Sequence, residues 1–190
     1  MSSSRRSVVE LDESIQAIRR RVSELLQEHA AVTISDCILL EMSKEGWQAA
    51  KEYFPQERGV YIHFAEYLGT IVVFRLGLSV QKSGIQGRWF HNHASHVHSF
   101  RHQWDQNLWH GGENYCHFFS QITQYFPETW MLFVITPEMN IRTVQLLEQY
   151  LIDQLQPLWE YQDNDQYVWK NGFSMVAPPS LHSLIENSLQ

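Results

Sequence analysis

An acidic side chain stands where a helix would be expected to be apolar. Between residues 141 and 155 apolar residues recur at helical spacing, and Glu148 lies in the middle of the stripe that they form. The members of this stripe are Ile141, Val144, Leu151, Ile152 and Leu155. Burying an unpaired carboxylate is costly, so something must compensate its charge. A structural salt bridge is one explanation, and a divalent metal ion or a cation beside a phosphate is an equally open one.

Arg88 carries a charge of the sign that phosphate chemistry requires. It follows Gly84-Ile85-Gln86-Gly87, and we expect it in the first turn of a helix, on one polar face with His91 and Asn92. A guanidinium presents a planar fork of donors to phosphate oxygens, and the positive end of a helix strengthens this interaction. The two glycines would let the main chain approach a ligand, or would simply form a turn.

Positive charge is concentrated around Arg88 although the whole chain is acidic. The 190 residues carry a net charge of −7, which argues against indiscriminate coating of nucleic acid. Residues 67–104 nevertheless lack Asp and Glu altogether, and they contain five histidines. Their basic residues are Arg75, Lys82, Arg88 and Arg101. We expect a local anion-binding face with nucleic-acid contacts from Lys82, Arg88, His93 and Arg101, and a solvated surface is the alternative.

A group of histidines in the middle of the chain offers a second chemistry. Seven of them lie between residues 91 and 117, and pairs such as His98 and His102, together with Cys116-His117, could ligate zinc. No spacing matches a known two-plus-two or HExxH zinc motif. Contacts with DNA or structural roles are therefore favoured, and a zinc hydrolase is the less favoured reading.

Hydrophobic periodicity predicts the elements that must position these residues. Helical spacing marks four segments, which are residues 8–30, 33–54, 85–98 and 137–156. Runs rich in β-branched and aromatic residues mark four strands, which are residues 59–64, 70–76, 129–136 and 166–170. The first two strands are joined by a short connection that contains Gly69, which predicts a β-hairpin.

Composition favours a folded, intracellular protein. Hydrophobic residues make up 44% of the chain and aromatic residues 13%, which is enough for a sizeable core. No apolar run approaches the roughly 20 residues that a membrane span needs, and the first residues lack an apolar signal core. Cys37 and Cys116 show no metal or redox spacing. We therefore expect a cytoplasmic protein with no membrane partner.

Four short blocks, taken in order, resemble the GIY-YIG nuclease superfamily. Gly59-Val60-Tyr61 stands where the family has its first Gly-Ile-Tyr strand, and Leu76-Gly77-Leu78-Ser79 where the second strand reads Ile-Gly-x-Ser. Arg88 occupies the position of the family's helix arginine. Leu147-Glu148-Gln149-Tyr150-Leu151-Ile152, followed by Pro157, matches the helix that bears its acid. The resemblance covers roughly residues 59–160.

The resemblance implies a metal-dependent DNA endonuclease, restriction-like or repair-like. Glu148 would hold one Mg²⁺ or Mn²⁺, and Arg88 would bind the scissile phosphate. Tyr61, relayed by His91 or Asn92, would orient or deprotonate the attacking water. Arg75 would lower the pKa of that phenol or hold a second phosphate. Without the other blocks, a tyrosine packed at the sheet edge would be the favoured reading of Tyr61.

Three positions depart from the family pattern and keep a second reading open. The family's second tyrosine falls on Arg75, or on Phe74 with a one-residue slip. Asn92 stands where the family has His or Tyr, and the expected asparagine falls on Glu160, with Asn164 nearby. The alternative to an enzyme is therefore a catalytically degenerate module of the same fold that binds nucleic acid or regulates.

The expected architecture is a small α/β domain of the α+β kind. It would hold a mainly antiparallel GIY-YIG-like sheet flanked by helices, with an N-terminal helical extension. Three parts are predicted, namely the extension at residues 1–57, the catalytic domain at 58–160 and a C-terminal elaboration at 161–190. DNA is the expected partner, and cutting of both strands would imply either a homodimer or sequential nicking.

Overall fold

The computed structural model describes residues 8–29, 31–42, 44–67, 70–93, 126–162 and 166–169. Its helical elements are α1 (Val8–Leu25), α2 (Lys44–Ala50), the 3₁₀ segment η1 (Lys51–Tyr53), α3 (Gly84–Gly87), the π-helical segment η2 (Arg88–His93) and α6 (Ile141–Leu155). Its strands are β1 (Thr33–Ile34), β2 (Ile38–Glu41), β3 (Gly59–Tyr67), β4 (Thr70–Ser79), β5 (Glu128–Ile135), β6 (Trp159–Gln162) and β7 (Gln166–Trp169).

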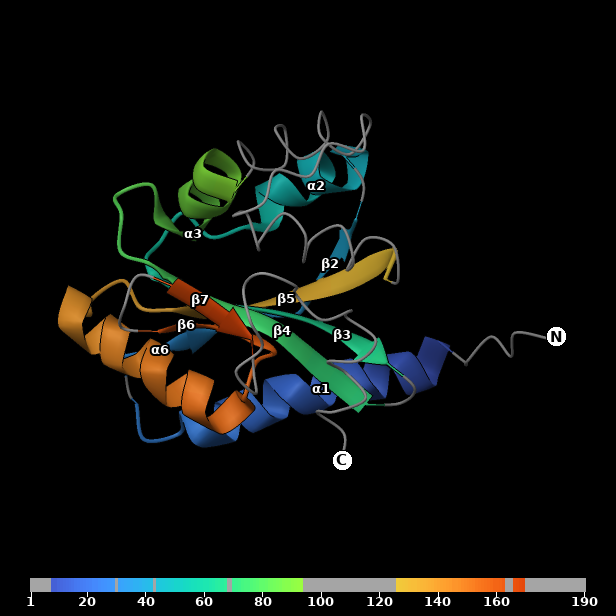
Figure 1. The fold of residues 1–190 in the computed structure, drawn as a ribbon, viewed down its shortest axis with the longest axis horizontal. Coiled ribbons are helices and arrows are strands. Elements are labelled where there is room, and N and C mark those ends of the chain that lie inside the picture. Colours follow the sequence, from blue (N-terminus) through green and yellow to red (C-terminus); the bar gives the residue numbers. More distant parts are fainter. Residues whose placement is uncertain are drawn as a thin grey trace, which may run out of the picture.

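The strands of the described residues form one seven-stranded sheet. Their spatial order is β1-β5-β3-β4-β6-β7, and β2 also pairs with β5. Strand β3 lies at the centre, antiparallel to both β4 and β5, whereas β4 and β6 are parallel and meet at Arg75 and Trp159. Helices α1 and α6 cover one face, and α2 and α3 cover the other (Figure 1). The predicted α+β class, with a mainly antiparallel sheet between helices, is confirmed.

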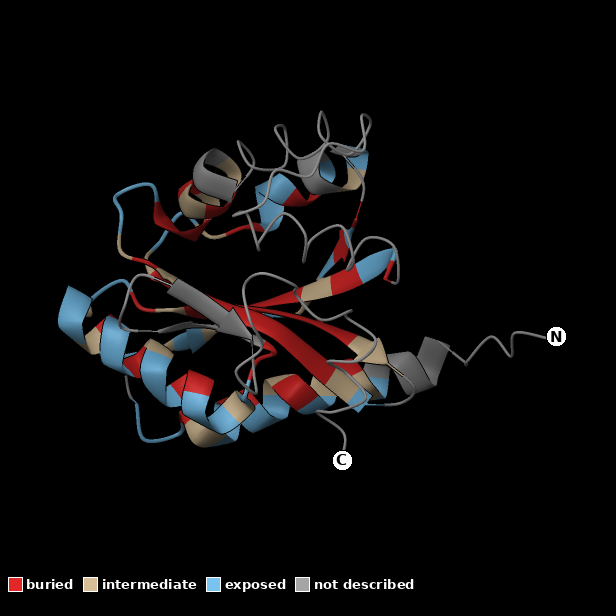
Figure 2. Cartoon of the chain, viewed as in Figure 1, coloured by how far each residue is buried: buried red, intermediate tan, exposed pale blue. Residues whose placement is uncertain are grey.

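The sheet separates two hydrophobic cores. On one face, α1 and α6 pack onto the sheet, and the buried side chains there include Ile15, Val22, Ile62, Leu132 and Leu151. On the other face, residues of α2, α3 and η2 pack onto the sheet, and the buried side chains there include Leu40, Phe54, Phe74, Ile85, Trp89 and Phe133. Figure 2 shows buried residues along the central strands and exposed residues on the outer sides of α1 and α6. Burial on both faces explains why the central strands are apolar almost throughout.

The helix predicted over residues 33–54 is wrong for its first half. Residues 33–34 and 38–41 are strands β1 and β2, which pair with β5 through contacts such as Thr33 with Ile135 and Leu40 with Thr129. Leu40 is buried whereas Leu39 and Glu41 on either side of it are exposed, which is the period of a strand. Pairing there supplies main-chain partners to one side of β5 that would otherwise be a sheet edge.

The remaining predicted elements are found with small shifts. The predicted helices at 8–30 and 137–156 correspond to α1 and α6, and the four predicted strands to β3, β4, β5 and β7. Helix α6 begins later than expected because Asn140, not Pro137, caps it, and the Asn140 Oδ1 accepts a hydrogen bond of 3.0 Å from the Thr143 amide. The helix predicted at 85–98 is helical through His93, and residues 94–98 lie outside the described chain. Strand β6 was not predicted.

Two of the three consecutive arginines on α1 fasten this helix to its neighbours. Arg19 donates from Nε to the Ser35 carbonyl at 2.8 Å and pairs with Asp36 at 3.4 Å. Arg21 donates from Nη2 to the Gln154 carbonyl near the end of α6 at 2.9 Å. A guanidinium at the C-terminal carbonyls of a helix also interacts favourably with its dipole. These two arginines therefore have structural roles, and α1 belongs to the same packed unit as α6.

Within the described chain, no helix has both the length and the apolar character needed to cross a membrane.

We expect Ile15→Ala in α1 and Leu151→Ala in α6 to destabilise the protein by similar amounts, about 2–5 kcal/mol each. Both side chains are buried in the same core, so each substitution leaves a cavity there. Chemical denaturation followed by tryptophan fluorescence and by circular dichroism measures the free energy of unfolding. The matched control is Leu146→Ala, because Leu146 is 63% exposed on the outer side of α6. Loss of α1 structure alone, with the sheet unaffected, would contradict a shared core.

Candidate active site at the edge of strand β4

Glu148 lies on α6 with its carboxylate directed at strand β4. The neighbouring residues Leu147, Leu151 and Ile152 are buried against the sheet, and Glu148 itself is half-buried. Burial raises the pKa of Glu148 from 4.5 to about 7, whereas the Arg75 guanidinium, a main-chain hydrogen bond from Leu78 and the Arg88 guanidinium lower it. The acid is therefore close to both arginines and to the main chain of β4.

Arg75 reaches this place from the middle of β4. It is only 5% exposed and lies directly opposite His63 of β3. The register of the two strands shifts between His63 and Phe64, so that Phe74 is an extra residue of β4 without a direct partner. The irregularity places Arg75 on the face that carries Tyr61 and Trp89, three positions along β4 from Leu78.

Arg88 is positioned by a tight turn after β4. Gly84 has a positive φ of 61°, and a side chain there would overlap the main chain of Gln56. Ser79 donates from Oγ to the Gly84 carbonyl at 2.7 Å, and the Ile85 amide donates to the Glu57 carbonyl at 3.0 Å. Of the two roles that the sequence left open for this glycine, the turn is the one the structure shows. It delivers Arg88 at the start of η2.

Tyr61 packs against the same segment of β4. Its partner in the ladder is Gly77, and a Cβ on Gly77 would overlap the phenol oxygen and ring carbons. On its other side the Trp89 ring meets it edge to face, with centroids 5.2 Å apart and an interplanar angle of 77°. Tyr61 is 1% exposed. The phenol hydroxyl thus lies over Gly77, the residue before the Leu78 amide that serves Glu148.

Three of the predicted site residues are linked by charge, because Arg75 of β4 and Arg88 of η2 both lower the pKa of Glu148 on α6. Tyr61 of β3 lies over Gly77, but it belongs to the core on the face of the sheet opposite α6. Lys82 is exposed in the turn between β4 and α3. Residues 91–93 lie in η2, but the structure describes only their main chain, as it does for Glu160. Arg101 and Asn164 lie outside the described residues.

Two buried polar residues close to this site were missed from the sequence. His63 is 1% exposed in β3, and its Nε2 lies 2.8 Å from the Thr129 hydroxyl of β5. Burial and the charge of Arg75 lower the pKa of His63 to about 3. The available signal was a histidine within the apolar strand Gly59–Tyr67, because a buried polar group needs a partner.

Metal binding by protein ligands alone finds no support among the described residues. No group of three or more His, Cys, Asp or Glu in that part of the chain is arranged to hold a metal ion. A single carboxylate such as Glu148, supplemented by water and substrate phosphate, is a ligand set that Mg²⁺ accepts. The histidines considered for zinc lie at 91–117, where the structure describes no side chain.

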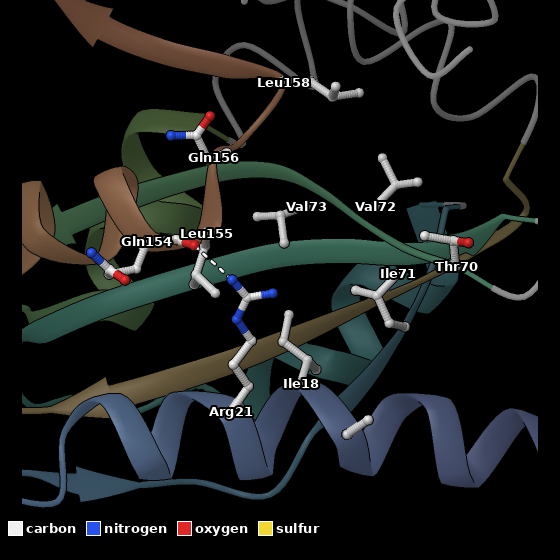
Figure 3. A pocket seen from close by; sticks show the side chains of 11 residues that line it. Ile18, Arg21, Thr70, Ile71, Val72, Val73, Gln154, Leu155, Gln156 and Leu158 are labelled. Carbon is white, nitrogen blue, oxygen red and sulfur yellow. Dashed lines mark hydrogen bonds between the residues drawn. The ribbon is translucent and has the colours of Figure 1, made fainter. Parts of the chain in front are cut away.

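Two hollows among the described residues are separate from this site. A cavity of about 420 Å³ lies between α1, the first residues of β4 and the end of α6 (Figure 3). It is lined mainly by apolar side chains such as Ile18, Ile71 and Leu155, and its Arg21 is bonded to the Gln154 carbonyl. It contains no carboxylate, histidine or thiol. A second hollow of about 650 Å³ lies around Arg21, His29 and Tyr150, and the carboxylates of Glu24 and Glu28 also line it. Neither hollow is lined by Tyr61, Arg75, Arg88 or Glu148.

Three comparisons with known proteins were made for this chain. Comparison of the chain with models of known protein families, with curated proteins and with solved structures finds no match. The resemblance to the GIY-YIG superfamily stays a prediction from the four sequence blocks.

We expect Glu148→Gln to stabilise the metal-free protein at high pH. The folded state holds the Glu148 proton more tightly than the unfolded chain, so wild-type stability falls as the pH rises from about 4.5 to about 7. The glutamine variant lacks this loss. In EDTA it should exceed the wild type by on the order of 3 kcal/mol above pH 7 and match it near pH 4. Parallel profiles, as expected for the control Glu138→Gln at an exposed site, would contradict the raised pKa.

Gly77→Ala tests the contact that places Tyr61. The new Cβ would overlap the phenol, so we expect a loss of about 1–3 kcal/mol in a Tyr61 background. In a Tyr61→Ala background the same change should cost little, because the overlapping ring is gone. The four free energies of unfolding form a double-mutant cycle. Additive effects would show that Gly77 does not support the tyrosine.

Proposed function

We propose that this protein is a metal-dependent DNA endonuclease of the GIY-YIG type that hydrolyses phosphodiester bonds. The observation that carries the proposal is the convergence of Glu148 with Arg75 and Arg88. Glu148 lies 60 positions after Arg88 in the chain, yet the charges of both arginines act on its carboxyl group. An acid beside two guanidiniums can bind a cation and a phosphate at adjacent places.

The charge of Glu148 supports a bound Mg²⁺ or Mn²⁺. Burial raises its pKa more than the two arginines and the Leu78 hydrogen bond lower it, so the protein alone does not fully compensate the carboxylate. A divalent cation would complete that compensation, and carboxylate oxygen is the ligand that Mg²⁺ prefers. When bound, the metal would neutralise charge on the departing 3′ oxygen.

The arginines and the tyrosine have distinct roles in this proposal. Arg88, half-buried at the start of η2, binds the scissile phosphate and stabilises the charge that grows on it. Arg75 holds a second phosphate oxygen and, two ladder positions from Tyr61, favours the ionised form of its phenol. Tyr61 orients the attacking water, with His91 or Asn92 as its proton relay.

DNA outside the scissile phosphate would be held by the acid-free segment 67–104. Lys82 is exposed beside the turn that delivers Arg88, and it contacts the neighbouring backbone in this proposal together with His93 and Arg101. One chain provides one active site in this assignment, so linear product would require either a homodimer on DNA or two sequential nicks.

Nicking of supercoiled plasmid in Mg²⁺ or EDTA tests the proposed activity. We expect metal-dependent nicking by the wild type and a loss of at least about 10²-fold in Glu148→Ala and in Arg88→Ala, because each removes a charge that acts in the transition state. The matched controls are Glu138→Ala and Arg20→Ala, which change exposed residues and should retain activity.

The alternative class gives a different result in the same assay. DNA that is bound without any metal-dependent cutting would identify a non-cleaving module that binds nucleic acid or regulates. Equal rates for Glu148→Ala and the wild type would reject the assignment of the acid. If nicking persists in EDTA and the purified protein contains one zinc ion per chain by elemental analysis, the result would point instead to a zinc site built from the histidines.

A further inference from the structure

A row of polar residues crosses one face of the sheet and ends at the candidate site. Thr129 of β5, His63 of β3 and Arg75 of β4 are all buried. Thr129 lies opposite Leu40 of β2, and His63 lies opposite Arg75 on one side and Met131, two residues after Thr129, on the other. The order β2, β5, β3, β4 is also the spatial order of these strands. The charge of Arg75, the last member of the row, also acts on Glu148 of α6.

The hydrogen bonds of Thr129 fix the orientation of the His63 ring. The Thr129 hydroxyl lies 2.8 Å from His63 Nε2, which is the shortest of its side-chain contacts. It also lies 3.3 Å from the Leu40 carbonyl and 3.3 Å from the Met42 sulfur. These contacts join the His63 ring to strands β5 and β2.

Aromatic neighbours hold the same ring from the sides. Phe74 and Trp89 meet it edge to face, with centroids at 5.3 Å and 5.8 Å. Burial and the nearby Arg75 lower the pKa of His63 to about 3, which keeps it uncharged at physiological pH. Arg75 lies directly opposite this buried histidine in the β3–β4 ladder, and its charge acts on both His63 and Glu148.

We propose that Thr129 and His63 are positioning residues for Arg75, and that they hold its guanidinium at the edge of β4 where it meets Glu148 and a substrate phosphate. The inference deepens the proposed function, since it names how that site keeps its second cation in place. A long side chain with four rotatable bonds is pre-organised only if its surroundings restrict it. His63 and Thr129 supply that restriction, and Thr129 does so from β5, a strand that contributes no catalytic group.

Three threonine variants separate positioning from packing. Thr129→Val removes the hydroxyl and keeps the shape, whereas Thr129→Ser keeps the hydroxyl. Thr136→Val is the matched control, because Thr136 is equally buried just after β5 and its hydroxyl has no hydrogen-bond partner within the described chain. All three retain the overall volume of the core closely enough to be compared as folded proteins.

The first readout is hydrogen exchange of the Arg75 Nε–H, assigned in nitrogen-15 spectra by its disappearance in Arg75→Lys. We expect Thr129→Val to speed this exchange about fivefold or more, the factor that losing one buried hydrogen bond produces in a local opening equilibrium. Thr129→Ser should restore the wild-type rate, and Thr136→Val should leave it unchanged. This readout does not require that the protein cut DNA.

The second readout is the nicking reaction. Thr129→Val should lower kcat about tenfold or more and change KM little, since a misplaced cation weakens the transition state more than substrate binding. Wild-type exchange and wild-type kcat in Thr129→Val would overturn the positioning role, whatever the wild-type activity. If the wild type does not nick DNA but Thr129→Val still loosens Arg75, the nuclease proposal fails and the positioning of Arg75 stands.

Discussion

The structure depends on one partly uncompensated negative charge at the edge of a sheet. Glu148 is buried enough that its proton is held near neutral pH, although two guanidiniums and a main-chain amide all favour the ionised form. In a protein interior an unpaired carboxylate costs several kcal/mol, a large part of the stability of a domain. Strongly perturbed carboxyl groups gather at functional sites, and this is why we propose that the charge of Glu148 binds a cation next to a phosphate.

The other elements serve to bring that charge to β4. The irregular pairing of β3 and β4 places Arg75 directly opposite His63, and the turn at Gly84 precedes Arg88 at the start of η2. Helix α1 lies on the same face of the sheet as α6 and is bonded to it twice. Arg21 donates to the Gln154 carbonyl at 2.9 Å, and the Leu25 carbonyl accepts a hydrogen bond from the Tyr150 hydroxyl at 3.5 Å. The N-terminal helix thus supports the helix that carries the acid.

The sequence predicted the helix that carries Glu148 and the β3–β4 hairpin, but not the strands β1, β2 and β6. A carboxylate in an apolar stripe and a pair of β-branched runs are local signals, and both led to correct elements. Residues 33–41 were misjudged because their apolar pattern fits a helix or a strand, and the deciding partner, β5, lies almost a hundred residues away. His63 and Thr129 were missed for the same reason, since their roles arise only when β2, β5, β3 and β4 lie side by side.

The most direct test of this account is the titration of the Glu148 carboxyl carbon by carbon-13 NMR, assigned through Glu148→Gln, without and with Mg²⁺. The account predicts a pKa of about 7 without metal, a higher pKa when Arg75 or Arg88 is replaced by methionine, and a marked fall when Mg²⁺ is added. A carboxyl group that titrates near 4.5 and responds neither to the loss of the arginines nor to Mg²⁺ would contradict it.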